Sequence, residues 1–193
     1  MNLDKQIKDM EKEHNVGGDS EWMNIVEGAN KLRLVTELAV LPQWWDGVKY
    51  HVAVEGDKRP ESTTVSIKWL GWVIDRSDGE QGKLKLIKLP HTVAKQIRDL
   101  QQSEDYSFEE APMPYDITVN AKGAGTKEVE YSTMPSPKRE DVPEDVLKVL
   151  GKKSTPESVV NAMKNKRGRE LGLVEEKTSE VDYPEDDLGE PKF

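Results

Sequence analysis

The chain has 193 residues, of which 35% are hydrophobic and 34% are charged, and its formal net charge is −9. This length favours one ordinary domain with extensions over two large domains, and the high share of charge predicts that part of the chain lies outside any packed core. The sequence contains no cysteine, which excludes disulfides and thiolate metal sites, and its three histidines are too scattered for a metal site.

Membrane and export signals are not evident in the sequence. No apolar run approaches the roughly 18 to 20 residues that a membrane helix needs. The first ten residues show no basic segment followed by an apolar one. We therefore expect a cytoplasmic protein without a membrane partner.

The first part of the chain predicts a short arm followed by a mainly β domain. In the arm, residues 1–21, Leu3, Ile7 and Met10 lie near helical spacing. Alternating apolar residues between Gly, Asp and Pro clusters then predict six strands. These cover residues 32–40, 48–54, 63–75, 83–89, 115–121 and 128–133. Between the fourth and fifth strands, apolar residues at helical spacing predict one helix, capped by Thr92.

Within residues 63–75 the apolar alternation slips by one position at Trp69–Leu70, next to Gly71. A slip beside a glycine predicts a β-bulge, which lets a small sheet bend strongly enough to close into a barrel. Five or six short strands with one helix before the last pair match a single OB-fold barrel, although SH3-like and other small barrels use similar pieces. We assign this barrel to residues 22–135.

The sequence after Pro135 predicts a short helical, basic extension over residues 136–174. Asp141 and Glu144 resemble a capping box, and Thr155 followed by Pro156 starts a second, basic helix. Residues 175–193 have no periodicity and hold eight acidic and two basic residues, a net charge of −6. This composition predicts a disordered acidic tail and leaves the rest of the chain room for basic surfaces.

Three segments in order resemble the single-stranded DNA-binding proteins of bacteriophages. They are VEGANKLRLV at 26–35, WLGWVIDRSDGEQGKLKLIKLPHTVAKQI at 69–97 and YDITVNAKGAGTKEVEY at 115–131. The resemblance spans about residues 22–135 and implies an OB-fold that acts in DNA replication, recombination or repair, in the bacterial host cytosol if the chain is phage-encoded. The final YPEDDLGEPKF adds a second likeness, since these proteins commonly end in an acidic run with a terminal aromatic residue.

Binding single strands without sequence preference needs aromatic faces for bases and cations for phosphates. The predicted stacking platform is Trp45, Tyr50 and Trp72, although a strand tryptophan in a small barrel often fills the core instead. Lysines such as Lys83 and Lys85 could equally form a solvated outer face. The predicted DNA-binding residues are Trp45, Lys49, Tyr50, Lys68, Trp69, Trp72, Arg76, Lys83, Lys85 and Lys122.

No catalytic set stands out in the sequence. Asp75, Asp78 and Glu80 are expected to be solvated turn residues without a histidine or nucleophile beside them, and residues 123–125 predict a hairpin turn. We therefore expect a non-enzymatic protein that binds single-stranded DNA and needs no cofactor or metal. The alternatives are a protein-interaction scaffold on an OB-like barrel that binds no nucleic acid, and a nuclease.

The acidic tail is predicted to recruit replication or recombination proteins. Asp186, Asp187 and Glu190 supply charge, while Phe193 offers an aromatic anchor and a terminal carboxylate. The tail could also occupy the basic groove when DNA is absent, or serve only as a solubilising element. Self-association on DNA is a further expectation.

Overall fold

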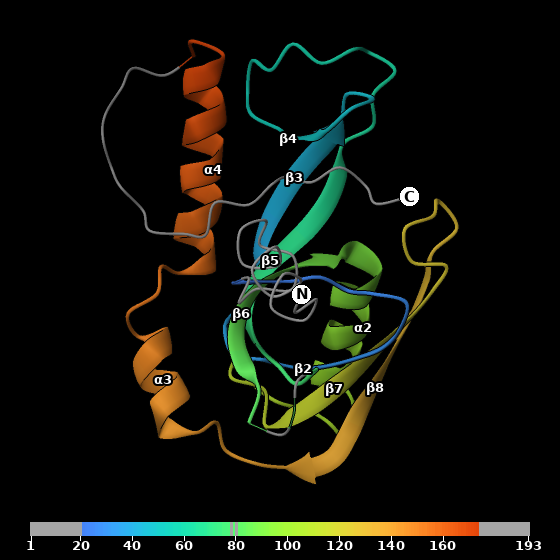
Figure 1. Cartoon of the computed structure of the whole chain (residues 1–193), viewed down its shortest axis with the longest axis vertical. Helices are drawn as coiled ribbons and strands as arrows, with labels where there is room; N and C mark the ends of the chain where they lie inside the picture. Colours follow the sequence, from blue (N-terminus) through green and yellow to red (C-terminus); the bar gives the residue numbers. More distant parts are fainter. Residues whose placement is uncertain (1–20, 78, 80, 174–193) are drawn as a thin grey trace, which may run out of the picture.

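The computed structural model describes residues 21–77, 79 and 81–173 (Figure 1). Its strands are β1 (Trp22–Met23), β2 (Gly28–Leu34), β3 (Ala39–Trp45), β4 (Tyr50–Val52), β5 (Ser66–Asp75), β6 (Lys83–Pro90), β7 (Tyr115–Lys122) and β8 (Glu130–Arg139). Its helices are α2 (His91–Gln101), α3 (Glu144–Leu150) and α4 (Pro156–Glu170). A mainly β chain with one helix between strands and a helical extension after them is confirmed.

The strands form one mixed sheet in the order β1-β6-β5-β2-β7-β8, and β3 pairs with β5 and β4. Among the strands of the described residues, only β1 and β6 are parallel neighbours. In the described residues no ladder joins β8 to β6 or β1, so the sheet is curled but open rather than the closed barrel we expected (Figure 1). β8 does not pair with β6 because β1 already pairs with the edge of β6 that faces away from β5, at Leu86 and Ile87.

The bulge predicted in β5 is not observed there; the irregularity lies in the neighbouring chain between β2 and β3. β5 pairs with β6 in unbroken register from Lys68 to Asp75. β2 and β3 follow one another along the other edge of β5, and residues 35–38 between them pass opposite Gly71 and the residue after it. A Cβ atom on Gly71 would lie 2.7 Å from Leu38 Cδ2, so any other residue at this position would require the Leu38 side chain to shift. The apolar pattern of β5 shifts because its last six residues are all buried.

Two apolar clusters lie on the two faces of β5. The inner cluster contains Val73 and side chains of α2, and consists of Met23, Leu32, Leu34, Val73, Ile87, Leu89, Val93, Ile97, Met113, Tyr115, Ile117 and Val119. The outer cluster joins the other face to α4, and contains Trp22, Val35, Leu41, Val52, Leu70, Trp72, Ile74, Leu86, Val142, Val159, Val160 and Met163. α4 therefore covers part of the outer face (Figure 1), and β8 continues past residue 135, the predicted boundary.

The helix starts differ from prediction in two of three cases. α2 begins one residue before Thr92, directly after Pro90, and α3 begins three residues after Asp141. Neither start has a side-chain cap, because a proline with extended backbone directly precedes each helix and leads into its first turn. The start of α4 is as predicted, since Thr155 Oγ1 accepts a hydrogen bond from the Ser158 N–H at 3.2 Å.

Candidate nucleic-acid interface

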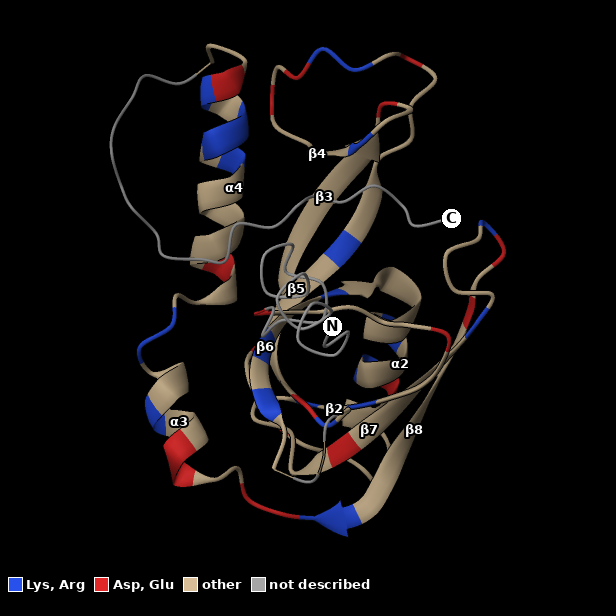
Figure 2. Cartoon of the chain, viewed as in Figure 1, with Lys and Arg blue, Asp and Glu red and all other residues tan. Residues whose placement is uncertain are grey.

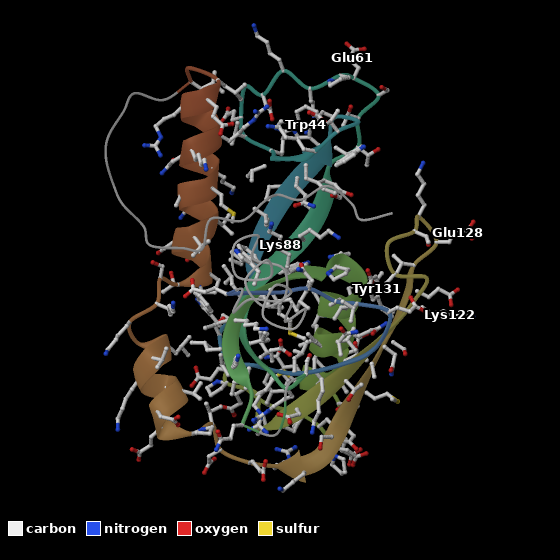
Figure 3. All side chains as sticks on the ribbon, viewed as in Figure 1. Trp44, Glu61, Lys88, Lys122, Glu128 and Tyr131 are labelled. Carbon is white, nitrogen blue, oxygen red and sulfur yellow. The ribbon has the colours of Figure 1, made fainter. Side chains whose placement is uncertain are left out.

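Trp72 and Trp44 are core residues. Trp72 is 1% exposed in the outer cluster, and its Nε1–H donates to the Ser154 carbonyl at 2.9 Å. Trp44 is 5% exposed and lies at the base of the loop that carries Glu61 (Figure 3), where its Nε1–H donates to Asp57 Oδ2 at 2.7 Å. Contrary to the prediction, Trp72 has no ring face open to a base, because α4 covers the sheet at that point.

Trp45 and Tyr50 form an aromatic pair at the tip of the β3–β4 hairpin. They are directly opposite in the ladder, with ring centroids 4.9 Å apart and planes inclined by 56°. Both are half-buried, and Lys49 between them in sequence is exposed. Each ring therefore keeps accessible surface, and an aromatic pair beside a cation can stack a base and neutralise its phosphate.

Asp46 fixes the geometry of this hairpin tip. Its Oδ1 accepts hydrogen bonds from the N–H groups of Val48 and Lys49, each at 2.7 Å, and its Oδ2 lies 2.6 Å from His51 Nε2. These hydrogen bonds hold the pKa of Asp46 well below its usual range. The largest contribution comes from the Lys49 N–H, the next from the His51 ring and the third from the Val48 N–H. His51 in turn stacks on Trp44 at 4.8 Å. These contacts therefore hold the hairpin tip against the buried Trp44 in the absence of a ligand.

We expect Asp46→Ala to loosen the hairpin tip while the sheet stays folded. Amide hydrogen exchange at Val48 and Lys49, followed by NMR, should become faster because both N–H groups lose their acceptor. Acid should act similarly on the unchanged protein. A carboxyl with a lowered folded pKa stabilises fully above its ordinary value of about 3.9, and loses this contribution as the pH falls through the lowered value. Unchanged exchange in Asp46→Ala would contradict this role; Asp99→Ala on α2 is the control.

Lys68 and Lys88 share the outer face of β5 and β6. Lys88 is opposite Leu70, two residues along from Lys68, so both lysines point to the same side. Lys68 is half-buried, and burial, followed by the charge of Lys88, lowers the pKa of Lys68. In the part of the chain that the structure describes, the Lys68 side chain has no hydrogen bond or ion pair. Because a half-buried cation repelled by another cation is costly, this arrangement favours an anionic ligand.

The aromatic pair lies on this same face. Leu41 and Gln43 of β3 are opposite Lys68 and Ser66 of β5, and Trp45 is two residues further along β3. At the other end, Lys88 Nζ lies 4.6 Å from the ring centroid of Trp22. Lys88 is in the middle of the view in Figure 3. We call this surface the outer strip; it consists of Trp45, Tyr50, Lys68 and Lys88, with the buried Trp22 ring beneath Lys88.

Arg76 and Lys85, predicted as phosphate contacts, pair with carboxylates of the protein. Arg76 Nε lies 3.4 Å from Asp116 Oδ2, and Lys85 Nζ lies 2.9 Å from Asp75 Oδ2. Burial raises the pKa of Asp75, but hydrogen bonds from Ser77 and Lys85 outweigh it, so that the pKa is lowered overall. Asp75 is therefore a buried strand residue and not the solvated turn residue that the sequence suggested. Its two neighbours in that prediction, residues 78 and 80, are outside the described residues.

Lys83 and Lys122 are exposed but are not part of the outer strip. Lys83 starts β6 and projects to the side opposite Lys88, by strand alternation. Lys122 ends β7, on a hairpin away from Lys88 (Figure 3). That hairpin contains the predicted turn at residues 123–125, which is confirmed by the hydrogen bond from the Thr126 N–H to the Gly123 carbonyl at 3.1 Å.

Trp69 points to the opposite side of β5 from Trp72, packs against the inner cluster and is half-buried. Its Nε1–H donates to His91 Nδ1 at 3.0 Å, and the two ring planes are inclined by only 16°. Sequence reasoning missed His91 and Trp22. Lys88 was considered as a phosphate contact together with Lys83 and Lys85 but was not among the predicted DNA-binding residues, although alternation along residues 83–89 separates it from those two lysines.

Basic residues are also frequent in the C-terminal part of α4 (Figure 2), where Arg167 pairs with Asp57 at 3.2 Å. The tail residues Asp186, Asp187, Glu190 and Phe193 lie outside the described residues. Over the described ranges, no helix has the length and apolarity to cross a membrane, and no three histidine or acidic side chains cluster as metal ligands would. In comparisons with known proteins, no family model, curated protein or solved structure matches the chain.

Proposed function

We propose that the chain is a nucleic-acid-binding protein built on an OB-type arrangement of strands. More particularly, it is a non-enzymatic protein that coats single-stranded DNA, without sequence preference, during phage DNA replication, recombination or repair. The observation that carries the proposal is Lys68, a half-buried cation without an acidic partner among the described residues, on the same strand face as the Trp45–Tyr50 pair. A single strand supplies phosphates for the one and unpaired bases for the other.

The strand connectivity supports an OB-type arrangement. An OB-fold is a partly open, five-stranded Greek-key barrel that binds oligonucleotides on its second and third strands and on two loops. Here β2 and β3 together correspond to the first strand, β5 and β6 to the second and third, and β7 and β8 to the last two, with α2 between the third and fourth. Lys68 and Lys88 then lie on the second and third strands, and the Trp45–Tyr50 hairpin lies in the loop between the first two.

A titration with oligothymidine, followed by intrinsic tryptophan fluorescence at two salt concentrations, tests the proposal. We expect binding to single strands, with a slope of log K against log salt of about −0.7 for each phosphate neutralised. Duplex DNA should bind more weakly because its bases remain stacked on one another. Equal affinity for duplex and single strand would show that the aromatic residues do not take part.

Lys68→Gln should weaken single-strand binding and make the salt slope shallower by about 0.7, the share of one phosphate contact. The same substitution should leave the free protein equally stable or more stable, because it removes a half-buried charge that Lys88 repels. Oligothymidine titration and urea unfolding measure the two effects. Lys148→Gln, at an exposed lysine on α3, is the matched control. A loss of stability without a loss of affinity would assign Lys68 to folding alone.

The acidic tail completes the proposal on sequence grounds alone. Its net charge of −6 opposes binding of phosphates to the strand face, and we infer that Asp186, Asp187, Glu190 and Phe193 bind replication or recombination proteins. Self-association on DNA remains part of the same proposal.

A further inference from the structure

A groove of about 270 Å³ runs along α2 on the side of β5 opposite the outer strip. Its walls are mainly apolar and are made by Leu34, Leu38, Trp69, Ala94, Ile97 and Phe108. Pockets that hold drug-sized ligands have roughly 300 to 1,000 Å³. The groove therefore has room for one ring system rather than for a larger ligand.

Trp69 and His91 form one wide flat surface in this groove. The indole N–H lies in the indole plane, and the lone pair of His91 Nδ1 lies in the imidazole plane. Because these two atoms are hydrogen-bonded at 3.0 Å and the planes are inclined by only 16°, the rings lie edge to edge, consistent with their centroid separation of 6.1 Å. The two rings together present a surface wider than either ring alone, and stacking on such a surface does not depend on base identity.

The rim of the groove carries positive charge. Lys95 and Arg98, at i and i+3, supply this charge on the side of α2 that lines the groove, beside the neutral His91 ring. Arg98 pairs with Asp99 at 2.9 Å, but both side chains are more than half exposed, so this pair is weak and easily exchanged. Glu37 is the acidic residue of the lining, and its Oε1 accepts a hydrogen bond from the Ala111 N–H at 2.8 Å. An apolar groove with a cationic rim suits a nucleotide.

The groove is close to the outer strip along the chain. Trp69 directly follows Lys68, and the β5–β6 ladder ends at the pair of Lys68 and Pro90. Beyond this pair, β6 no longer covers the edge of β5, because the chain turns into α2 at His91. A bound DNA strand with a phosphate at Lys68 can therefore cross the edge of β5 at this point and reach Trp69.

We propose that one nucleobase of a bound single strand enters this groove and stacks on the joined Trp69–His91 plane, with a neighbouring phosphate at Lys95 and Arg98. This inference rests on the proposed function and adds a base subsite to it. A side chain of a partner protein is the competing occupant. The cationic rim and the short path from Lys68 favour the nucleotide.

The test compares two single strands of equal length. One is oligothymidine, and the other is an abasic strand with the same sugar–phosphate backbone and no bases. Stacking is worth roughly 1 to 3 kcal/mol per base, so Trp69→Leu should lower the affinity for the intact strand by about 5- to 150-fold. Its affinity for the abasic strand should not change. Trp69→Phe should restore part of the loss, and His91→Ala, at an exposed residue, should lower the same affinity by a smaller factor. Lys95→Gln should weaken binding of both strands, with Lys148→Gln as its control.

The outcomes separate this inference from the proposed function. Absence of binding by the unchanged protein would overturn both. Normal binding by Trp69→Leu, as expected if the groove takes a side chain of another protein, would overturn the base subsite and leave the DNA-binding proposal standing. Equal losses on intact and abasic strands would also overturn the subsite. Should Trp69→Leu fail to fold in urea titrations, His91→Ala decides, and an unchanged affinity there would count against the subsite.

Discussion

Replacing Trp72 by alanine should lower the free energy of unfolding by about 3 to 5 kcal/mol, the range for removing a large aromatic from a core. The ring is 1% exposed between the sheet and α4. Its removal would also take the indole N–H away from the Ser154 carbonyl, which accepts a hydrogen bond from it. Lys153 Nζ also lies 5.5 Å from the ring centroid. The loss should appear as a lower midpoint in urea unfolding. The fraction that remains folded should bind DNA with unchanged affinity.

Trp45→Ala is the matched comparison for this prediction. Trp45 is half-buried at the hairpin tip, so its removal should affect stability less and should weaken single-strand binding by roughly 1 to 3 kcal/mol. Trp72→Phe keeps most of the packing and should fall between the unchanged protein and Trp72→Ala in stability. If Trp72→Ala weakened DNA binding while leaving the unfolding midpoint unchanged, our placement of Trp72 in the core would be wrong.

The strand positions could be predicted because half-buried strands alternate in sequence. Five of the six predicted strands each correspond to one observed strand, with displaced ends. The sixth, residues 32–40, spans the end of β2, residues 35–38 and the start of β3, because the chain leaves the edge of β5 between its two ladders with that strand. β1 was not predicted because two residues are too few to show a period.

The site could be predicted only in part, because burial depends on what packs against each face. Alternation places Trp69 and Trp72 on opposite sides of β5, but only the long-range packing of α4 decides that Trp72 is the covered one. Similarly, the sequence does not show whether a given lysine or arginine binds a phosphate of a ligand or a carboxylate of the protein. The partners of Arg76 and Lys85, Asp116 and Asp75, become visible only in the fold.

Asp116 is at the centre of a group of charges in which the side chains of Arg33 and Arg76 are buried. Three cations surround its carboxylate: Arg33 Nε at 2.7 Å, Arg76 Nε at 3.4 Å and Lys31 Nζ at 3.5 Å. Arg33 is 1% exposed and also donates to the Glu140 carbonyl at 2.7 Å. The group therefore ties β2, the end of β5, β7 and the residue after β8 to one another.

Asp116→Ala should cost about 3 to 5 kcal/mol of unfolding free energy, because it leaves the buried Arg33 without its carboxylate. The double variant Arg33→Met with Asp116→Leu should cost less than Asp116→Ala alone, since apolar residues of similar size can replace a buried ion pair at little cost. Added salt should change these losses little, because buried charges are poorly screened. Glu144→Ala, which breaks the exposed pair with Lys148, should cost at most about 0.5 kcal/mol in the same urea experiment. Strictly additive losses at Arg33 and Asp116 would show that the two side chains stabilise the fold independently, and that their charges do not act as one group.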